Sequence, residues 1–458
     1  MKLTRYVAID PHSGSQVRSF PVATADEVSS ALAASERAFG DWRRTAFSER
    51  AAILRRAATL LREGAPAHAR LIAEEMGKPL ASGVAEAEKC AWVCEYYAEH
   101  GEAMLADEVT QTEARLSYVT YRPLGPLLAI MPWNYPFWQV FRFAAPALMA
   151  GNTVVLKHAP NVPGCAQALE RLLVEAGLPD SCFRSVFLTD AQAGAVIRNR
   201  RIRGVTLTGS VRAGKAVARQ AGAHIKKTVL ELGGSDPYLV LEDADVEMAA
   251  TLCVRSRLSN SGQSCIAAKR LIVVEPVREA FTEAVVARMR EAKVGNPLEE
   301  GTEVGPMARE DLRAGLHAQV AGSVAKGARL LLGGEIPSGP GWYYPTTVLA
   351  DVRKGAPAYT QELFGPVAAI LAARDRAHAI RLANDTSFGL GAAVFTADVA
   401  EGERIARDEL NAGCCFVNSF VRSDPRLPFG GVMDSGYGRE LGHQGIHEFV
   451  NAKMVQLA

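Results

Sequence analysis

Short apolar segments alternate with helical segments along most of this chain, and this alternation constrains the fold more than any single residue does. Residues 153–157, 185–188 and 204–208 read as strands, and a helical pattern follows each of them. Beyond Gly234 the alternation resumes, with strand patterns at residues 238–241, 270–274, 367–371, 392–396 and 414–417. Strands separated by helices favour parallel sheets. We therefore predict an α/β fold that begins with a nucleotide-binding βαβ sheet.

The length of the chain predicts more than one domain. It has 458 residues, whereas single hydrophobic cores stop growing near ~250–300 residues. Two large domains are expected, with a boundary near Gly233 and Gly234. The first hundred residues are mostly helical in pattern, and Thr24 followed by Glu27 predicts a capping box at a helix start.

Charge and composition exclude several classes of protein. A net charge of +1 gives no basic field for nucleic acid or a membrane surface. The first residues lack the apolar run of a signal peptide, and no apolar stretch is long enough to span a membrane, so we expect a cytoplasmic protein. The eight cysteines form no CxxC pair, and His443 and His447 have no third ligand nearby, so no metal site is expected.

Cys265 is the candidate nucleophile. It ends the run Asn-Ser-Gly-Gln-Ser-Cys at residues 260–265, where small polar residues and Gly262 suit a loop that presents a sulfur. The thiolate is the attacking form, so the site must lower a pKa that starts near ~8.5. A buried structural thiol is the alternative, and these residues alone leave both interpretations open.

Two other segments supply groups that a nucleophilic thiol needs. Asn134 follows Trp133 between two prolines, either as a rigid turn or as a locked amide donor for an oxyanion, whose loss typically costs about 10²–10³ in rate. Glu231 ends a strand before two glycines, either as a charge at a strand end or as a general base. The domain boundary would place Glu231 and Cys265 on either side of a cleft.

In this order, the segments around Asn134, Glu231 and Cys265 resemble the aldehyde dehydrogenase superfamily. Further motifs extend the resemblance over residues 132–442. It implies that Cys265 attacks the aldehyde, that Asn134 and the Cys265 N–H hold the oxyanion, and that Glu231 activates water. The resemblance also implies three parts of the chain. A Rossmann-type cofactor domain would comprise residues 1–112 and 126–233, and a second α/β catalytic domain residues 234–440. A small oligomerisation element would comprise residues 113–125 and 441–458.

The resemblance also implies an NAD(P) site. The run 209–216 is one residue short of a P-loop, because Ala216 stands where Ser or Thr would bind Mg²⁺. Lys157 is implied at the adenine ribose, and Pro160 replaces the glutamate that repels a 2′-phosphate in NAD-preferring relatives. NADP is therefore expected to be preferred, with NAD also used. The remaining implied cofactor residues are Trp133, Gly209, Ser210, Glu362 and Phe364.

Resemblance to succinate-semialdehyde dehydrogenases implies that Arg142 and Ser423 bind a substrate carboxylate. Ser259 stands where many relatives carry a second arginine, which leaves open whether Arg255 or Arg257 replaces it. Ala267 replaces a redox-switch cysteine, so no such switch is expected. Succinate semialdehyde is the expected substrate. The alternatives are another ω-carboxy or aliphatic aldehyde, or an inactive cofactor-binding or structural protein.

The expected partners are a small aldehyde and further copies of the chain. A homodimer or homotetramer is implied, built through strands around residues 116–128 and the tail at 451–458. That tail contains Met454, Val455 and Leu457, and could add a strand to a neighbour's sheet edge.

Overall fold

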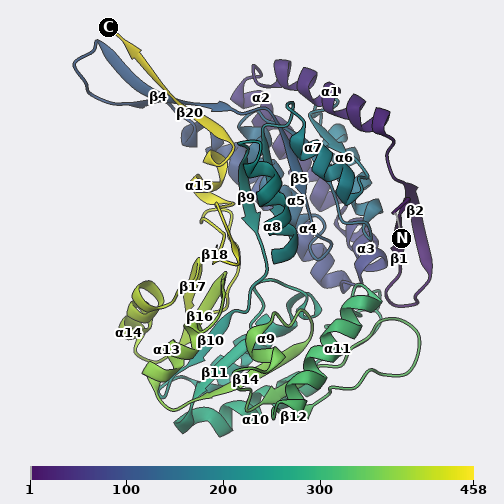
Figure 1. The fold of residues 1–458 in the computed structure, drawn as a ribbon, viewed down its shortest axis with the longest axis vertical. Helices are drawn as coiled ribbons and strands as arrows, with labels where there is room; N and C mark the ends of the chain where they lie inside the picture. Colours follow the sequence, from purple (N-terminus) through teal and green to yellow (C-terminus); the bar gives the residue numbers. More distant parts are fainter. Residues whose placement is uncertain (1–2) are drawn as a thin grey trace.

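A computed structural model describes residues 3–458 and contains two large sheets, three small ones and the helices that cover them (Figure 1). The α/β prediction is confirmed, because both large sheets are parallel except at one edge strand each. Each of these sheets has its own set of covering helices, and the two bodies lie one above the other in Figure 1. No helix in the described part of the chain is long and apolar enough to cross a membrane.

The first large sheet has the strand order β19-β9-β8-β5-β6-β7. Every residue of β6 and β8 is buried, which explains why both are mainly apolar and β-branched, with Lys157 at the end of β6. The predicted strand at 185–188 is wrong in its position, since its pairing with β6 ends at Ser185. The strands are β5 (Pro126–Ile130), β6 (Thr153–Lys157), β7 (Phe183–Ser185), β8 (Gly204–Thr208), β9 (Lys227–Glu231) and β19 (Gly436–Tyr437).

The second large sheet has the order β12-β13-β14-β11-β10-β16-β17. The strands predicted beyond Gly234 are all present in it, with ends that shift by one or two residues. The strands are β10 (Pro237–Val240), β11 (Arg270–Val274), β12 (Arg329–Leu332), β13 (Thr347–Ala350), β14 (Val367–Ala373), β16 (Gly391–Phe395) and β17 (Cys414–Val417).

The N-terminal region contains a hairpin that the sequence pattern did not reveal, followed by four helices. The hairpin pairs β1 (Arg5–Ile9) with β2 (Gln16–Pro21). The predicted capping box is confirmed, because Thr24 accepts a hydrogen bond from the Glu27 N–H and Glu27 accepts one from the Thr24 N–H. The helices are α1 (Ala25–Trp42), α2 (Phe47–Glu63), α3 (Ala65–Met76) and α4 (Leu80–Met104).

The other helices mostly connect parallel strands. Those around the first sheet are α5 (Trp138–Met149), α6 (Pro163–Glu175), α7 (Asp190–Arg198) and α8 (Val211–Gly222). The later ones are α9 (Val246–Leu258), α10 (Glu275–Glu291), α11 (Glu310–Ala325), α12 (Pro357–Thr360), α13 (Arg376–Asn384), α14 (Val399–Arg404) and α15 (Gly442–His447).

A long two-stranded ribbon, extended by one short strand, projects from the body of the molecule (Figure 1). It consists of β4 (Leu116–Pro123) between β20 (Val450–Leu457) and β3 (Glu108–Val109). β20 pairs along its whole length with β4 of the same chain and is an edge strand of this sheet, so the addition of the tail to a neighbour's sheet edge stays a prediction. Residues 116–128 also divide between two sheets, since β5 lies between β8 and β6. The last small sheet pairs β15 (Phe388–Gly389) with β18 (Val432–Met433).

Candidate active site

The loop that carries Cys265 has an unusual backbone. It follows α9, and Asn260 and Ser261 both have left-handed φ values, of 53° and 55°. Gly262 continues this conformation at φ 74°, and a Cβ there would lie 2.3 Å from the backbone of Gly365. The backbone at Gly262 therefore lies close to that of Gly365, and a side chain at this position would displace the loop.

Two buried cations hold this loop through its carbonyl groups. Arg257 donates hydrogen bonds to the carbonyls of Ala268 at 3.1 Å and Gly262 at 2.5 Å. Lys269 donates to those of Ser264 at 3.0 Å and Cys265 at 2.6 Å. Arg257 is therefore a support of the loop. Lys269 had no signal in the sequence, because only the fold directs its ammonium group back to the loop.

Asn134 lies against the same loop. Its side-chain N–H donates to the Gln263 carbonyl at 3.1 Å, and its own carbonyl accepts from the Asn260 side chain at 2.8 Å. Asn134 is buried, so its amide is fixed in place. An amide nitrogen carries two N–H donors, which leaves one for another acceptor.

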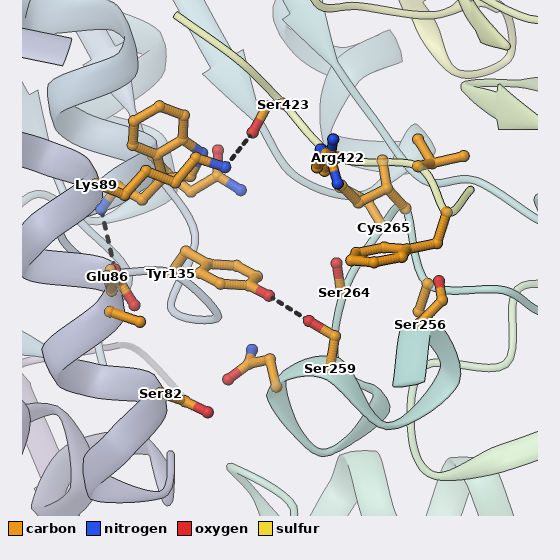
Figure 2. Close-up of a pocket in the computed structure, with 18 of the residues that line it drawn as sticks. Ser82, Glu86, Lys89, Tyr135, Ser256, Ser259, Ser264, Cys265, Arg422 and Ser423 are labelled. Carbon is orange, nitrogen blue, oxygen red and sulfur yellow. Dashed lines mark hydrogen bonds between the residues drawn. The ribbon is translucent and has the colours of Figure 1, made fainter. Parts of the chain in front are cut away.

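Cys265 stands where two clefts meet. A larger cleft of about 400 Å³ runs past Tyr135, Trp138 and Ser423, and a second of about 220 Å³ runs past Trp133 and Gly209. Cys265 lines both clefts and is partly exposed, whereas five of the eight cysteines are buried. Figure 2 shows it in the larger cleft, opposite the α4 side chains. The Cys265 sulfur can therefore contact one ligand in the larger cleft and another in the smaller cleft.

The smaller cleft gathers most of the predicted cofactor residues. The Trp133 and Phe364 rings meet edge to face at 5.7 Å, and Glu362 accepts a hydrogen bond from the Gly234 N–H at 3.1 Å. Ser210 caps the start of α8, so the positive end of that helix faces this region. The cleft is lined by Pro132, Trp133, Asn134, Gln139, Thr208, Gly209, Ser210, Leu232, Gly233, Cys265, Leu312, Glu362 and Phe364.

A third cleft, of about 230 Å³, lies on the other side of the α8 start. Lys157 lines it and forms an ion pair of 3.4 Å with Asp190, and Arg212 lines the same space. A helix N-terminus between two clefts, one with aromatic rings and one with two cations, fits a dinucleotide whose phosphates lie at the helix start. The predicted cofactor residues therefore line two clefts, and each cleft also includes residues from the start of α8 or the turn before it.

Glu231 does not line any of these three clefts. Its carboxyl group is buried at the end of β9, and a Cβ on Gly430 would lie 2.6 Å from it. Burial and the neighbouring Glu440 raise the Glu231 pKa well above its ordinary value, while Arg142 opposes the rise. The next residues, Leu232 and Gly233, do line the smaller cleft. The structure thus places Glu231 directly behind the cleft, with its carboxyl group in a buried charged cluster.

The two predicted substrate residues have different surroundings. Arg142 is 2 % exposed, pairs with Glu440 and lies with its guanidinium 4.7 Å from the Phe429 ring centre. Ser423 accepts a hydrogen bond from Lys89 at 2.8 Å within the larger cleft. Both residues line that cleft, but the Arg142 charge already has an acidic partner.

Of the two nearby arginines, only Arg255 reaches the larger cleft, where its guanidinium lies 5.1 Å from the Phe420 ring centre. Ser259, which stands where relatives carry an arginine, is within 3.3 Å of the Tyr135 hydroxyl. Two further cleft residues were not predicted from the sequence: Gln139, which lines both clefts that meet at Cys265, and Lys89, which lines the larger one. The sequences of α5 and α4, which carry these two residues, did not indicate which face of each helix would line the cleft.

The resting thiol of Cys265 is expected to hold its proton. The expectation that the site lowers the Cys265 pKa is corrected, because burial raises this pKa to about 12 and Arg142 and Lys269 only partly oppose the rise. The rate of inactivation by iodoacetamide should therefore rise by about tenfold for each pH unit between pH 7 and 10 without levelling off. The measurement is residual activity against time at each pH. A plateau near pH 8.5, typical of an unperturbed thiol, would contradict this environment.

Comparison with known proteins places this geometry in context. Residues 2–455 match the model of the aldehyde dehydrogenase family. The succinate semialdehyde dehydrogenase [NAD(P)+] Sad of Escherichia coli is 48% identical over 99% of this chain and 98% of its own length. Succinate-semialdehyde dehydrogenase [NADP(+)] 1 of Mycobacterium tuberculosis is 47% identical over 98% of this chain and 99% of its own.

Solved structures agree over the whole chain. The structure of Gox0499 superposes with a TM-score of 0.98 at 41% identity and covers 100% of both chains. The succinic semialdehyde dehydrogenase of Streptococcus pyogenes, solved in complex with NADP+, gives a TM-score of 0.96 at 34% identity over 99% of each chain.

Proposed function

The chain belongs to the aldehyde dehydrogenase family, and we propose that it oxidises succinate semialdehyde to succinate with NADP as the preferred acceptor. The observation that carries this proposal is the position of Cys265, whose side chain borders both the larger cleft and the cleft with Trp133. An aldehyde in the first and a nicotinamide in the second would both face the sulfur. Relatives named for the same reaction support this substrate.

In the first chemical step the Cys265 thiol gives its proton to water in the cleft, and the resulting thiolate attacks the aldehyde carbon. The Cys265 N–H and the free N–H of Asn134 hold the oxyanion of the tetrahedral adduct. When bound, the oxidised nicotinamide supplies the acceptor for the hydride that leaves this adduct, which becomes a thioester. Trp133, Gly209, Ser210, Glu362 and Phe364 would hold the cofactor in the smaller cleft.

The second step is hydrolysis of the thioester. Glu231 takes a proton from water, and the resulting hydroxide attacks the thioester carbon, which breaks the C–S bond and releases the acid and the Cys265 thiolate. The raised pKa of Glu231 makes its carboxylate a stronger base, but a smaller fraction of it is ionised near neutral pH. The carboxyl group must also turn from its buried position towards the cleft. Hydrolysis is therefore expected to accelerate as the pH rises.

The preference for NADP follows from charges in the third cleft. Lys157 and Arg212 would attract a 2′-phosphate, and Pro160 carries no charge to repel it. Asp190, paired with Lys157, opposes this attraction. We therefore expect a modest preference for NADP rather than exclusion of NAD.

We also assign the domains and assembly as the sequence suggested. Residues 1–112 and 126–233 form the cofactor domain, residues 234–440 the catalytic domain, and residues 113–125 with 441–458 the oligomerisation element of a homodimer or homotetramer. The projecting ribbon of β4 and β20 supports a role in assembly, because it carries the exposed side chains of Leu116, Met454 and Leu457.

A panel of aldehydes tests the proposed function. Formation of reduced cofactor is followed with succinate semialdehyde and with butanal, each with NADP and with NAD. The highest kcat/KM should be found for succinate semialdehyde with NADP, by about 10–100-fold over butanal, because a charge-assisted hydrogen bond contributes about 1.5–3 kcal/mol. No turnover of any acidic aldehyde would contradict the substrate assignment.

A further inference from the structure

The larger cleft contains a cation that neither the sequence nor the family resemblance singled out. Lys89 extends from α4 towards Ser423 and lies with its ammonium group 4.4 Å from the Trp138 ring centre (Figure 2). Its Nζ donates a hydrogen bond to the Ser423 hydroxyl at 2.8 Å. An ammonium group carries three N–H donors, so two remain for a ligand.

Lys89 has no acidic partner among residues 3–458. The two nearest acids are committed to other cations, because Glu86 pairs with Lys78 and Asp424 pairs with Arg426. Glu86 also accepts hydrogen bonds from the Phe137 and Trp138 N–H groups. Within the described part of the chain, the positive charge of Lys89 therefore lacks a direct counter-ion.

The other cations of this cleft are less suited to hold an anion. Arg142 pairs with Glu440, so a substrate carboxylate would have to compete with a buried carboxylate already in place. Arg255 and Arg422 are exposed, and solvent and salt screen exposed charges. Lys89 is the cleft cation that is both partly buried and without an acidic partner in the described chain.

The energetics of Lys89 also favour an anionic ligand. Burial and, to a smaller degree, the positive charge of Arg142 lower its pKa to about 8, whereas Cys90, Asp424 and Glu86 oppose the shift. A bound carboxylate would stabilise the charged ammonium group and offset the free-energy cost of burying it. The indole of Trp138 and the ring of Tyr135 line the same cleft and would contact the methylene groups of a short aldehyde.

We propose that Lys89, oriented by Ser423, binds the free carboxylate of the substrate and thereby sets the preference for ω-carboxy aldehydes over neutral ones. This inference rests on the proposed oxidation of an acidic aldehyde and adds a specificity residue to it. Arg142 then acts mainly through its pair with Glu440, as a support for the buried cluster around Glu231.

The experiment compares kcat/KM for succinate semialdehyde and for butanal, with NADP, in the wild type and in single variants. The ratio of the two values is the readout, because steps common to both aldehydes cancel. Lys89→Met should lower the ratio by about 10–100-fold, mostly through KM for the acidic aldehyde. Lys89→Arg keeps the charge and should retain more of the ratio. If Lys89→Met does not fold, Lys89→Gln removes the same charge and is compared in its place.

Arg422→Met is the matched control, because it removes a cation from the same cleft at an exposed position. It should change the ratio by less than about threefold, as is typical of exposed charges. If the ratio of kcat/KM values fell equally in Arg422→Met and Lys89→Met, the preference would come from the overall positive charge of the cleft, and the specific role of Lys89 would be overturned. An unchanged ratio in Lys89→Met and Lys89→Gln would overturn it too, while leaving the proposed function intact. A wild-type enzyme that oxidises both aldehydes equally well would refute the proposed substrate, and this inference with it.

Discussion

Replacing Cys265 with Ala is expected to lower turnover by about 10⁴–10⁶-fold, a loss similar in size to removing the nucleophile in other covalent mechanisms. The reason is that no other thiol borders both clefts in the described chain. The cofactor should still bind, because the residues proposed to hold it are unchanged. Turnover is measured from reduced cofactor, and binding from quenching of tryptophan fluorescence, to which Trp133 contributes.

Cys415→Ala is the matched control for this experiment. Cys415 is a partly buried cysteine on β17 that lines none of the three clefts. It should retain turnover, which separates loss of the nucleophile from loss of any thiol. Substantial activity in Cys265→Ala would contradict covalent catalysis by this residue.

Glu231→Gln is expected to stall the enzyme after its first half-reaction. Gln closely matches the protonated carboxyl group that burial favours, so the variant should fold normally. Without a base for water, hydrolysis should slow by about 10²–10⁴-fold. Rapid mixing with succinate semialdehyde and NADP should then show a burst of about one reduced cofactor per active site, followed by a slow phase.

The position of Glu231 makes this experiment informative. Its carboxyl group lies beside Glu440 and Arg142 rather than in a cleft. If Glu231 only supported this buried cluster, the Glu231→Gln variant would lose the burst as well as steady-state turnover. A variant with normal steady-state rates would contradict any role as the base.

The sequence predicted the elements whose residues are buried on both faces. The strands β6, β8, β11 and β16 are mainly apolar or β-branched, with a charged residue only at one end of β6 and of β11, and each was predicted within one residue of its observed position. The short edge strand β7 was misplaced, because its end is set by pairing with β6 and not by its own pattern. The hairpin of β1 and β2 was missed because β1 is only five residues long and β2 has no buried residue to produce an alternating pattern.

The site residues divide in a similar way. Asn134 and Cys265 were identified from local motifs, and the fold brings their segments into contact through the Gln263 carbonyl. The pair of Arg142 with Glu440 joins α5 to a loop far along the chain, so no local pattern could have revealed that the arginine is occupied. Lys89 depends on how α4 is rotated against the cleft, which only tertiary packing decides.

The most direct test of the central claim is the mass of the peptide that contains Cys265 after the burst in Glu231→Gln. We predict that this peptide gains one succinyl group and that hydroxylamine removes it, as expected for a thioester. The Cys265→Ala variant should show no gain under the same conditions. Reduced cofactor formed without any acyl group on Cys265 would contradict covalent catalysis at the junction of the two clefts.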